Sequence, residues 1–172
     1  MKKYILVIGN GSYVLNDNYG DGVVLRSIIQ WNRINTNNSY TIILFYRDKN
    51  KKPKLEEKLK NIEGAEKIII KSLEKLDQVI ASKEIFASFI SVPDSSHYQY
   101  IEKFLFHEIP TWIVKPLTDN LQQAINITKF KNKDLLWVDY HKRFDISNML
   151  IKKFVKDNNY GKLLHYAVQY TQ

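Results

Sequence analysis

Lys115 stands at a place in the sequence where a side chain could take part in chemistry. It follows the short apolar run 111–114 and precedes Pro116. The run is typical of a buried strand, and in an α/β sheet ligands bind at the carboxyl ends of the strands. A lysine at that edge can donate a hydrogen bond to an oxygen that develops negative charge or, when desolvated, act as a base. The alternative is a solvated loop lysine that precedes a helix.

Two further polar clusters follow predicted strands and are candidates for contact with a ligand: Pro93, Asp94 and His97 in one, and His141 and Arg143 in the other. For His97 the alternative is a histidine that bonds to backbone in the first turn of a helix. Arg143 could instead form a solvated pair with the preceding lysine. The histidines are far apart and there are no cysteines, so we predict no metal site.

A glycine pair, Gly9 and Gly11, directly follows the apolar segment 4–8. After a strand, the first glycine permits a tight turn and the second lets backbone amides approach a pyrophosphate, with Ser12 and Tyr13 next in the loop. The third glycine of this fingerprint should be at position 14, which is a valine. The alternative is therefore a plain turn between a strand and a helix.

The glycine loop is also longer than the fingerprint expects, because the next helical pattern begins only at residue 23. The inserted loop must fold so that Gly20 or Gly22 brings the helix end near the phosphates. At the end of the second strand, the sequence Tyr46-Arg47-Asp48 does not decide between NAD and NADP as the cofactor. Arg47 would suit the 2′-phosphate of NADP, which we prefer, whereas Asp48 in the acidic position would favour NAD; Arg47 could also begin a solvated basic loop.

Strand and helix patterns alternate along the chain in the way that would position these residues. We predict strands at 4–8, 40–46, 67–70, 86–92, 111–114 and 135–140, and helices at 23–32, 55–61, 72–80, 95–106, 120–125 and 145–156. Ser72, the segment 118–120 and Asp145 are the expected helix caps. Strands separated by helical crossovers predict an α/β fold of the Rossmann type, a doubly wound parallel sheet covered on both faces.

The last segment breaks this alternation. Residues 162–171 follow a turn signal and alternate apolar and polar side chains, as a half-exposed strand does. A lone strand needs a partner, so we expect it to begin a second, α+β domain that the chain does not complete, or to pair with another copy in a homo-oligomer. The expected domains are 1–145, which binds the dinucleotide, and 146–172, a linking helix and that first strand.

Composition sets limits on the function. The 172 residues are 44% hydrophobic and 26% charged, and no apolar run approaches the roughly 20 residues that span a bilayer. The N-terminal apolar stretch lacks a cleavage site for export, which favours the cytoplasm. The net charge of +8 comes from scattered lysines with one dense cluster at 47–54, so we do not expect nucleic acid as a partner.

Taken in order, four segments resemble the Gfo/Idh/MocA oxidoreductases along essentially the whole chain: Ile8-Gly9-Asn10-Gly11, the exit Pro93-Asp94-Ser95-Ser96-His97, Val114-Lys115-Pro116, and Tyr140-His141-Lys142-Arg143-Phe144. Two positions depart from the family pattern. Val114 stands where the family has glutamate and Asp94 where it has asparagine, so the electrostatics around Lys115 should differ.

The resemblance implies an NAD(P)-dependent oxidoreductase that transfers a hydride between the cofactor and a hydroxyl of a sugar or cyclitol. It implies that Lys115 is the catalytic donor or base, that Pro93, Asp94, His97 and Pro116 line the cofactor, and that His141 and Arg143 lie near the substrate. It also implies a catalytic histidine in a second domain, so this chain alone is expected to be inactive. A non-catalytic NAD(P)-binding or sensor module is the alternative.

Overall fold

The computed structural model describes residues 3–15, 22–35, 40–157, 161–162 and 164–165. By its internal contacts the chain divides into two units, Met1–Asp139 and Tyr140–Gln172. All the strands that the structure describes belong to the first unit, and each unit is described by itself below.

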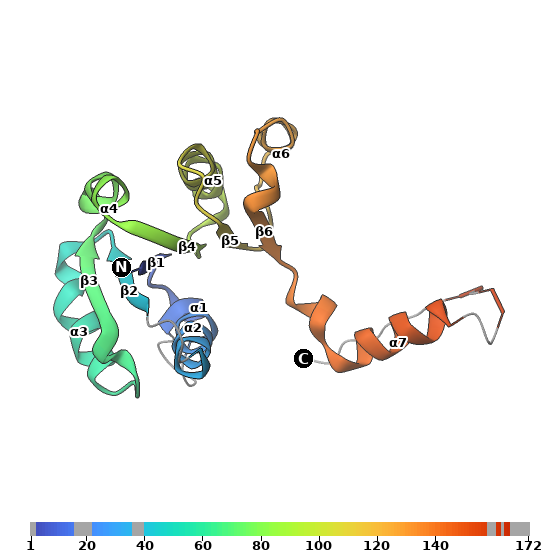
Figure 1. Ribbon diagram of the computed structural model, residues 1–172, viewed down its shortest axis with the longest axis horizontal. Coiled ribbons are helices and arrows are strands. Elements are labelled where there is room, and N and C mark those ends of the chain that lie inside the picture. Colours follow the sequence, from blue (N-terminus) through green and yellow to red (C-terminus); the bar gives the residue numbers. More distant parts are fainter. Residues whose placement is uncertain (1–2, 16–21, 36–39, 158–160, 163, 166–172) are drawn as a thin grey trace. The chain divides into compact units, whose positions relative to one another are not determined.

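The first unit is built on one parallel sheet (Figure 1). Its strands are β1 (Lys3–Ile8), β2 (Tyr40–Tyr46), β3 (Ile68–Ser72), β4 (Glu84–Ile90), β5 (Thr111–Val114) and β6 (Leu136–Asp139). Their order is β3-β2-β1-β4-β5-β6, and every neighbouring pair is parallel. This is the doubly wound Rossmann order, so the predicted fold class is confirmed. The order reverses between β1 and β4, and this is where such sheets bind ligands.

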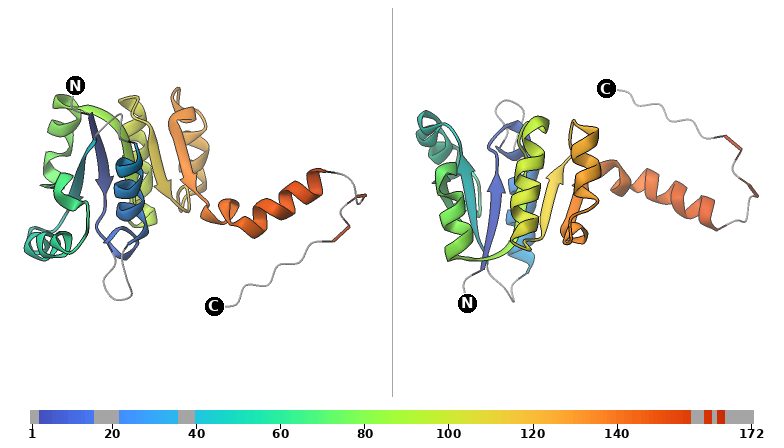
Figure 2. Two further views of the ribbon diagram at one scale, coloured as in Figure 1. Left: turned by 60° about the horizontal axis from the view of Figure 1, so that its bottom comes forward. Right: turned by 90° about the horizontal axis from the view of Figure 1, so that it is seen from above.

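Helices cover both faces of the sheet (Figure 2). The helices of this unit are α1 (Ser12–Leu15), α2 (Val23–Ile34), α3 (Lys52–Lys60), α4 (Leu76–Ser82), α5 (His97–Phe106) and α6 (Leu121–Ile127). Buried residues of α2 and α3 pack on one face, and those of α4, α5 and α6 pack on the other. None of the helices in the described part of the chain is both long and apolar enough to cross a membrane.

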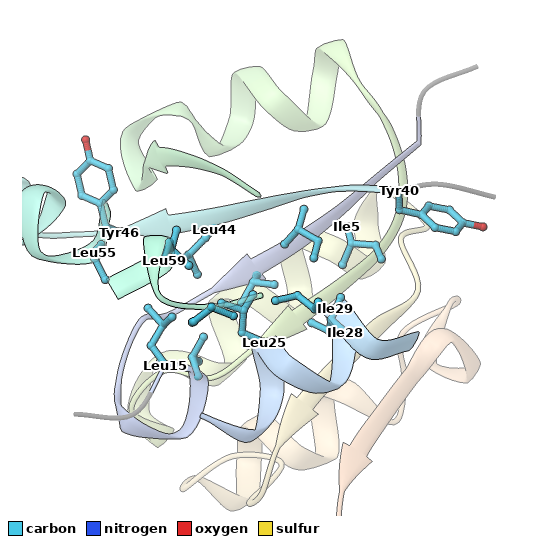
Figure 3. Packing of buried hydrophobic residues seen from close by; sticks show 14 residues of the cluster. Ile5, Leu15, Leu25, Ile28, Ile29, Tyr40, Leu44, Tyr46, Leu55 and Leu59 are labelled. Atoms are coloured by element: carbon cyan, nitrogen blue, oxygen red, sulfur yellow. The ribbon is translucent and has the colours of Figure 1, made fainter. Parts of the chain in front are cut away.

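The central strands are apolar on both sides, which explains why they form the middle of the sheet. In β1, Ile5 and Val7 face one core, and Leu6 and Ile8 face the other. Figure 3 shows the first of these cores, where the side chains of α2 meet those of β1 and β2. A run of apolar residues buried on both faces is what a parallel sheet requires. Burial, more than backbone preference, therefore holds the sheet together.

Three local predictions were wrong. Residues 12–15, expected in a loop, form the short helix α1. Ser72 stands at the start of a 3-10 turn but makes no capping bond, and its buried hydroxyl has no partner among the described residues. Asp145 precedes the last helix without a capping bond, and its carboxylate pairs with Lys142 at 3.2 Å. The predicted cap at Asn120 is confirmed, since its side chain accepts from the amide of Gln123 at 3.1 Å.

The second unit contains a 3-10 turn, His141–Phe144, and the helix α7 (Ile146–Lys156). The helix matches the one predicted at 145–156. The strand predicted at 162–171 lies mostly outside the described residues.

Candidate functional site

Gly9 ends β1 in a conformation that other residues rarely adopt. Its φ is +108°, and a Cβ at this position would lie 1.9 Å from the carbonyl oxygen of Ser91. The amide of Ser91 in turn donates to the carbonyl of Ile8 at 2.8 Å. The exits of β1 and β4 are therefore joined closely at the switch point of the sheet, and only glycine fits there.

Gly11 has a different environment. A Cβ there would meet nothing within 4 Å, so the space above it is open. Its carbonyl accepts from the amides of Val14 and Leu15 at 2.9 and 3.0 Å, which starts α1. The first amides of a helix have no partner within it, so those of Ser12 and Tyr13 are available in the turn beside this open space. The loop has the features that a pyrophosphate needs: open backbone, available amides and no acidic side chain between residues 9 and 15.

Gly22 compensates for the missing third glycine of the fingerprint. A Cβ on Gly22 would lie 2.1 Å from the carbonyl carbon of Val14, so the start of α2 returns directly to the end of α1. Val14 itself is fully buried in the core. The close contact that the fingerprint assigns to a glycine at position 14 is therefore present, but the glycine of the pair is Gly22 and its neighbour is Val14. Gly20 lies outside the described residues.

Arg47 and Asp48 follow β2 and have distinct surroundings. The Asp48 carboxylate accepts from the amide of Asn50 at 3.0 Å and so caps the turn that follows. Arg47 is exposed, and its positive charge lowers the pKa of Tyr100, although desolvation, the larger effect, leaves that pKa raised. Of the two candidates for the ribose end of a dinucleotide, Arg47 is the one whose side chain is not held in a turn.

His97 is wholly buried at the start of α5. Its Nδ1 lies 2.8 Å from the carbonyl oxygen of Pro116, and its Nε2 lies 3.0 Å from the carbonyl oxygen of Val92. The imidazole therefore bridges the exit of β4 and the exit of β5. Pro93 and Asp94, which lie between Val92 and His97 in the chain, are both exposed on the loop that this bridge holds.

Lys115 lies at the carboxyl end of β5, as its sequence position predicted. Its side chain is exposed, and within the described part of the chain no carboxylate forms an ion pair with it. The peptide that joins it to Pro116 is cis. The backbone next to Lys115 is thus held by the bond from His97 to Pro116, while the ammonium group is presented to solvent at the carboxyl edge of the sheet.

Asp139 is a further polar residue at the carboxyl edge of the sheet, and the sequence patterns above did not single it out. It is the last residue of β6, and its carboxylate accepts a hydrogen bond of 3.1 Å from the hydroxyl of Tyr13. Desolvation first, and then the charge and hydrogen bond of Asp139, raise the pKa of Tyr13. Its position at a strand's carboxyl end was the same signal that identified Lys115, and it could have been found in that way.

His141 and Arg143 belong to the second unit and are both exposed within it. The guanidinium of Arg143 lies 5.2 Å from the ring centre of Tyr140, in a cation–π contact. Their predicted contact with a substrate remains a prediction. Among the described residues no group of three histidine, aspartate or glutamate side chains could hold a metal ion.

A family model described as an oxidoreductase family with an NAD-binding Rossmann fold matches residues 29–140. No curated protein matches the sequence. Among solved structures, the chain is similar to an oxidoreductase from Agrobacterium radiobacter in complex with NAD+, L-tartaric acid and magnesium, with a TM-score of 0.66, 16% identity and coverage of 92% of this chain and 41% of the other.

Two further solved structures are similar to the chain to the same degree. Myo-inositol 2-dehydrogenase from Lactobacillus plantarum has a TM-score of 0.64 and 16% identity over 95% of this chain and 44% of its own. Aldose-aldose oxidoreductase from Caulobacter crescentus, complexed with glycerol, has a TM-score of 0.63 and 19% identity over 92% of this chain and 43% of its own. At these identities the likeness shows the fold, and the chain spans about four tenths of the length of each of these proteins.

Proposed function

Because the chain belongs to the Gfo/Idh/MocA family of oxidoreductases with an NAD-binding Rossmann fold, we propose that it binds NAD(P) for hydride transfer to or from a hydroxyl of a sugar or cyclitol. One observation carries the proposal. The glycine loop, the exit of β4 and Lys115 all lie at the carboxyl edge of one sheet, where the strand order reverses between β1 and β4. That edge is the binding place for dinucleotides in this architecture.

Each candidate residue has a role that follows from its position. The amides of Ser12 and Tyr13 would bind the pyrophosphate above Gly11, where no Cβ stands in the way. Pro93 and Asp94 would line the cofactor from the β4 exit, and His97 would hold that loop through Val92. A bound nicotinamide would supply the redox chemistry, as the acceptor or donor of the hydride.

Lys115 is the group that we propose acts on the substrate. In the oxidation direction its neutral amine would take the proton of the hydroxyl as hydride leaves the carbon for the cofactor. In the reverse direction its ammonium would donate a hydrogen bond to the carbonyl oxygen, stabilise the negative charge that develops there as hydride arrives at the carbon, and return the proton. The side chain is exposed in the chain alone, so a bound ligand would have to provide its desolvation. His141 and Arg143 are the proposed substrate contacts. The sugar or cyclitol class is supported by two proteins of similar structure, a myo-inositol 2-dehydrogenase and an aldose-aldose oxidoreductase.

We further propose that the cofactor is NADP in preference to NAD. Arg47 follows β2, at the position that meets the ribose of the adenosine half in a dinucleotide fold. The Asp48 carboxylate, which would favour NAD there, accepts a hydrogen bond from its own turn. A guanidinium binds a phosphate more strongly than a ribose hydroxyl, because both the charge and the paired hydrogen bonds favour it.

Cofactor titration tests the proposal directly. The full chain would be titrated with NADPH, NADH, NADP+ and NAD+, following quenching of tryptophan fluorescence and checking by calorimetry. We expect saturable binding, tighter for NADPH than for NADH. The matched control is Gly11→Ala, which adds one methyl group in the open space and should weaken binding of all four without unfolding the chain. If none of the four binds the wild-type chain, the proposed function is wrong.

A further inference from the structure

The geometry points to Asp139 as the residue that makes this site prefer the oxidised cofactor. We propose that its carboxylate, held in place by the hydroxyl of Tyr13, stabilises the positive charge of the nicotinamide ring in NAD(P)+ and so sets the ratio of affinities for the oxidised and reduced forms. This inference rests on the proposed function and goes further, because it assigns a specificity role to a residue that the sequence did not single out.

Asp139 lies at the carboxyl end of an edge strand of the sheet. It is the last residue of β6, and its register partner on β5 is Val114, the residue before Lys115. Neighbouring strands are about 4.8 Å apart, and register partners direct their side chains to the same face. Asp139 therefore brings a carboxylate to the carboxyl edge one strand away from Lys115, beside a valine where the family resemblance led us to expect a glutamate.

The strand order decides which half of a dinucleotide would lie near Asp139. In the order β3-β2-β1-β4-β5-β6, one mononucleotide lies over β1, β2 and β3 and the other over β4, β5 and β6. Arg47, after β2, is in the adenosine half. Lys115 and Asp139, after β5 and β6, are in the nicotinamide half. The nicotinamide ring carries a unit positive charge when oxidised and none when reduced, so a nearby carboxylate acts on one form only.

A hydrogen bond from Tyr13 holds the carboxylate of Asp139. The hydroxyl of Tyr13 donates to one oxygen, Oδ2, at 3.1 Å, and Tyr13 follows the glycine loop after β1. The bond thus links the exit of β1 to the exit of β6 across two intervening strands. The second carboxylate oxygen has no bond with a protein group in the described part of the chain. Asp139 is half-buried, so its charge is screened less than a fully exposed one.

The test measures dissociation constants for the oxidised and reduced forms of one cofactor in the full chain and in Asp139→Asn. The asparagine keeps the shape and an oxygen that can accept from Tyr13, but removes the charge. We expect the affinity for the oxidised form to fall about three- to tenfold, because a half-buried carboxylate then no longer attracts the positive charge of the ring. The affinity for the reduced form should change less than about twofold, because its ring is neutral.

Two control variants separate charge from structure. Glu84→Gln removes a carboxylate from the first residue of β4, at the opposite edge of the sheet, and should leave both affinities unchanged. Tyr13→Phe keeps the charge of Asp139 but removes the hydrogen bond that holds the carboxylate, so the loss of affinity for the oxidised form should be smaller than in Asp139→Asn. Asp139→Ser is a second charge-free variant, to be used if the asparagine variant does not fold by circular dichroism.

The outcomes are distinct. A change confined to the oxidised form in the charge-free variants supports the inference. An equal change for both forms, or no change, overturns it and leaves the proposed function standing. A wild-type chain that binds neither form overturns the inference together with the proposed function.

Discussion

Replacing His97 by alanine should destabilise the first unit far more than a typical surface change. The imidazole is 0% exposed, and its nitrogens lie 2.8 and 3.0 Å from the carbonyl oxygens of Pro116 and Val92. A neutral imidazole can donate one of these bonds, and a buried carbonyl that loses its donor costs about 1–3 kcal/mol. The cavity left by the ring adds to this cost. We therefore expect His97→Ala to lower the free energy of unfolding by about 2–4 kcal/mol, a large share of the roughly 5–15 kcal/mol of an ordinary domain.

Urea denaturation followed by circular dichroism measures this loss. The slope of the unfolding free energy against urea concentration should stay unchanged, because the surface exposed on unfolding is the same. The matched control is His107→Ala, because His107 is an exposed histidine at the end of the same helix. It should cost less than about 0.5 kcal/mol. In His97→Gln the side-chain amide can still donate to one of the two carbonyls, so part of the stability should return.

The result that refutes the reasoning is a His97→Ala variant no less stable than His107→Ala. A second consequence tests the link to the site. Since His97 bonds to the carbonyl oxygen of Pro116, the residue after Lys115, its removal should also weaken cofactor binding under conditions in which the variant is still folded. Binding equal to that of the wild-type chain would show that the bridge serves the fold alone.

Three further predictions follow from the geometry. Gly9→Ala should cost about 2 kcal/mol or more in urea denaturation, because of its positive φ and the contact with Ser91, whereas Gly11→Ala should leave stability within about 0.5 kcal/mol; equal losses would contradict this. Arg47→Ala should raise the dissociation constant of NADPH about tenfold and that of NADH less than twofold by fluorescence titration, and equal effects on the two would remove the basis for an NADP preference. Because the pKa of Tyr13 is raised in the folded chain above the ordinary value of 10.0, the unfolded chain releases this proton first as pH rises. The stability that Tyr13 contributes is present below pH 10.0 and is lost as the pH rises through its folded pKa. The pKa of Tyr100 is also raised and is unaffected by the substitution, so the alkaline fall in stability should be smaller in Tyr13→Phe than in the wild-type chain but not absent.

The sequence alone determined the class of fold, because the signal for each strand and helix lies within a few consecutive residues. The apolar runs at 40–46 and 111–114 are typical of strands in a parallel sheet, and their observed bounds agree with the prediction. The glycine pair and Lys115 could be placed at the carboxyl edge for the same reason: both directly follow such a run.

Contacts between distant residues could not be predicted in this way. The Tyr13 to Asp139 bond joins residues 126 positions apart, and the bridge made by His97 depends on Pro116, 19 positions away. Gly22 provides the close contact that the fingerprint assigns to position 14 only because α2 returns to α1. Local patterns carry the periodicity of each element, but the partners of a side chain depend on strand order and register, and these are set only when the whole sheet closes its two cores. The tertiary structure therefore decided which polar groups meet at the edge of the sheet, and with them the charges that a bound cofactor would encounter.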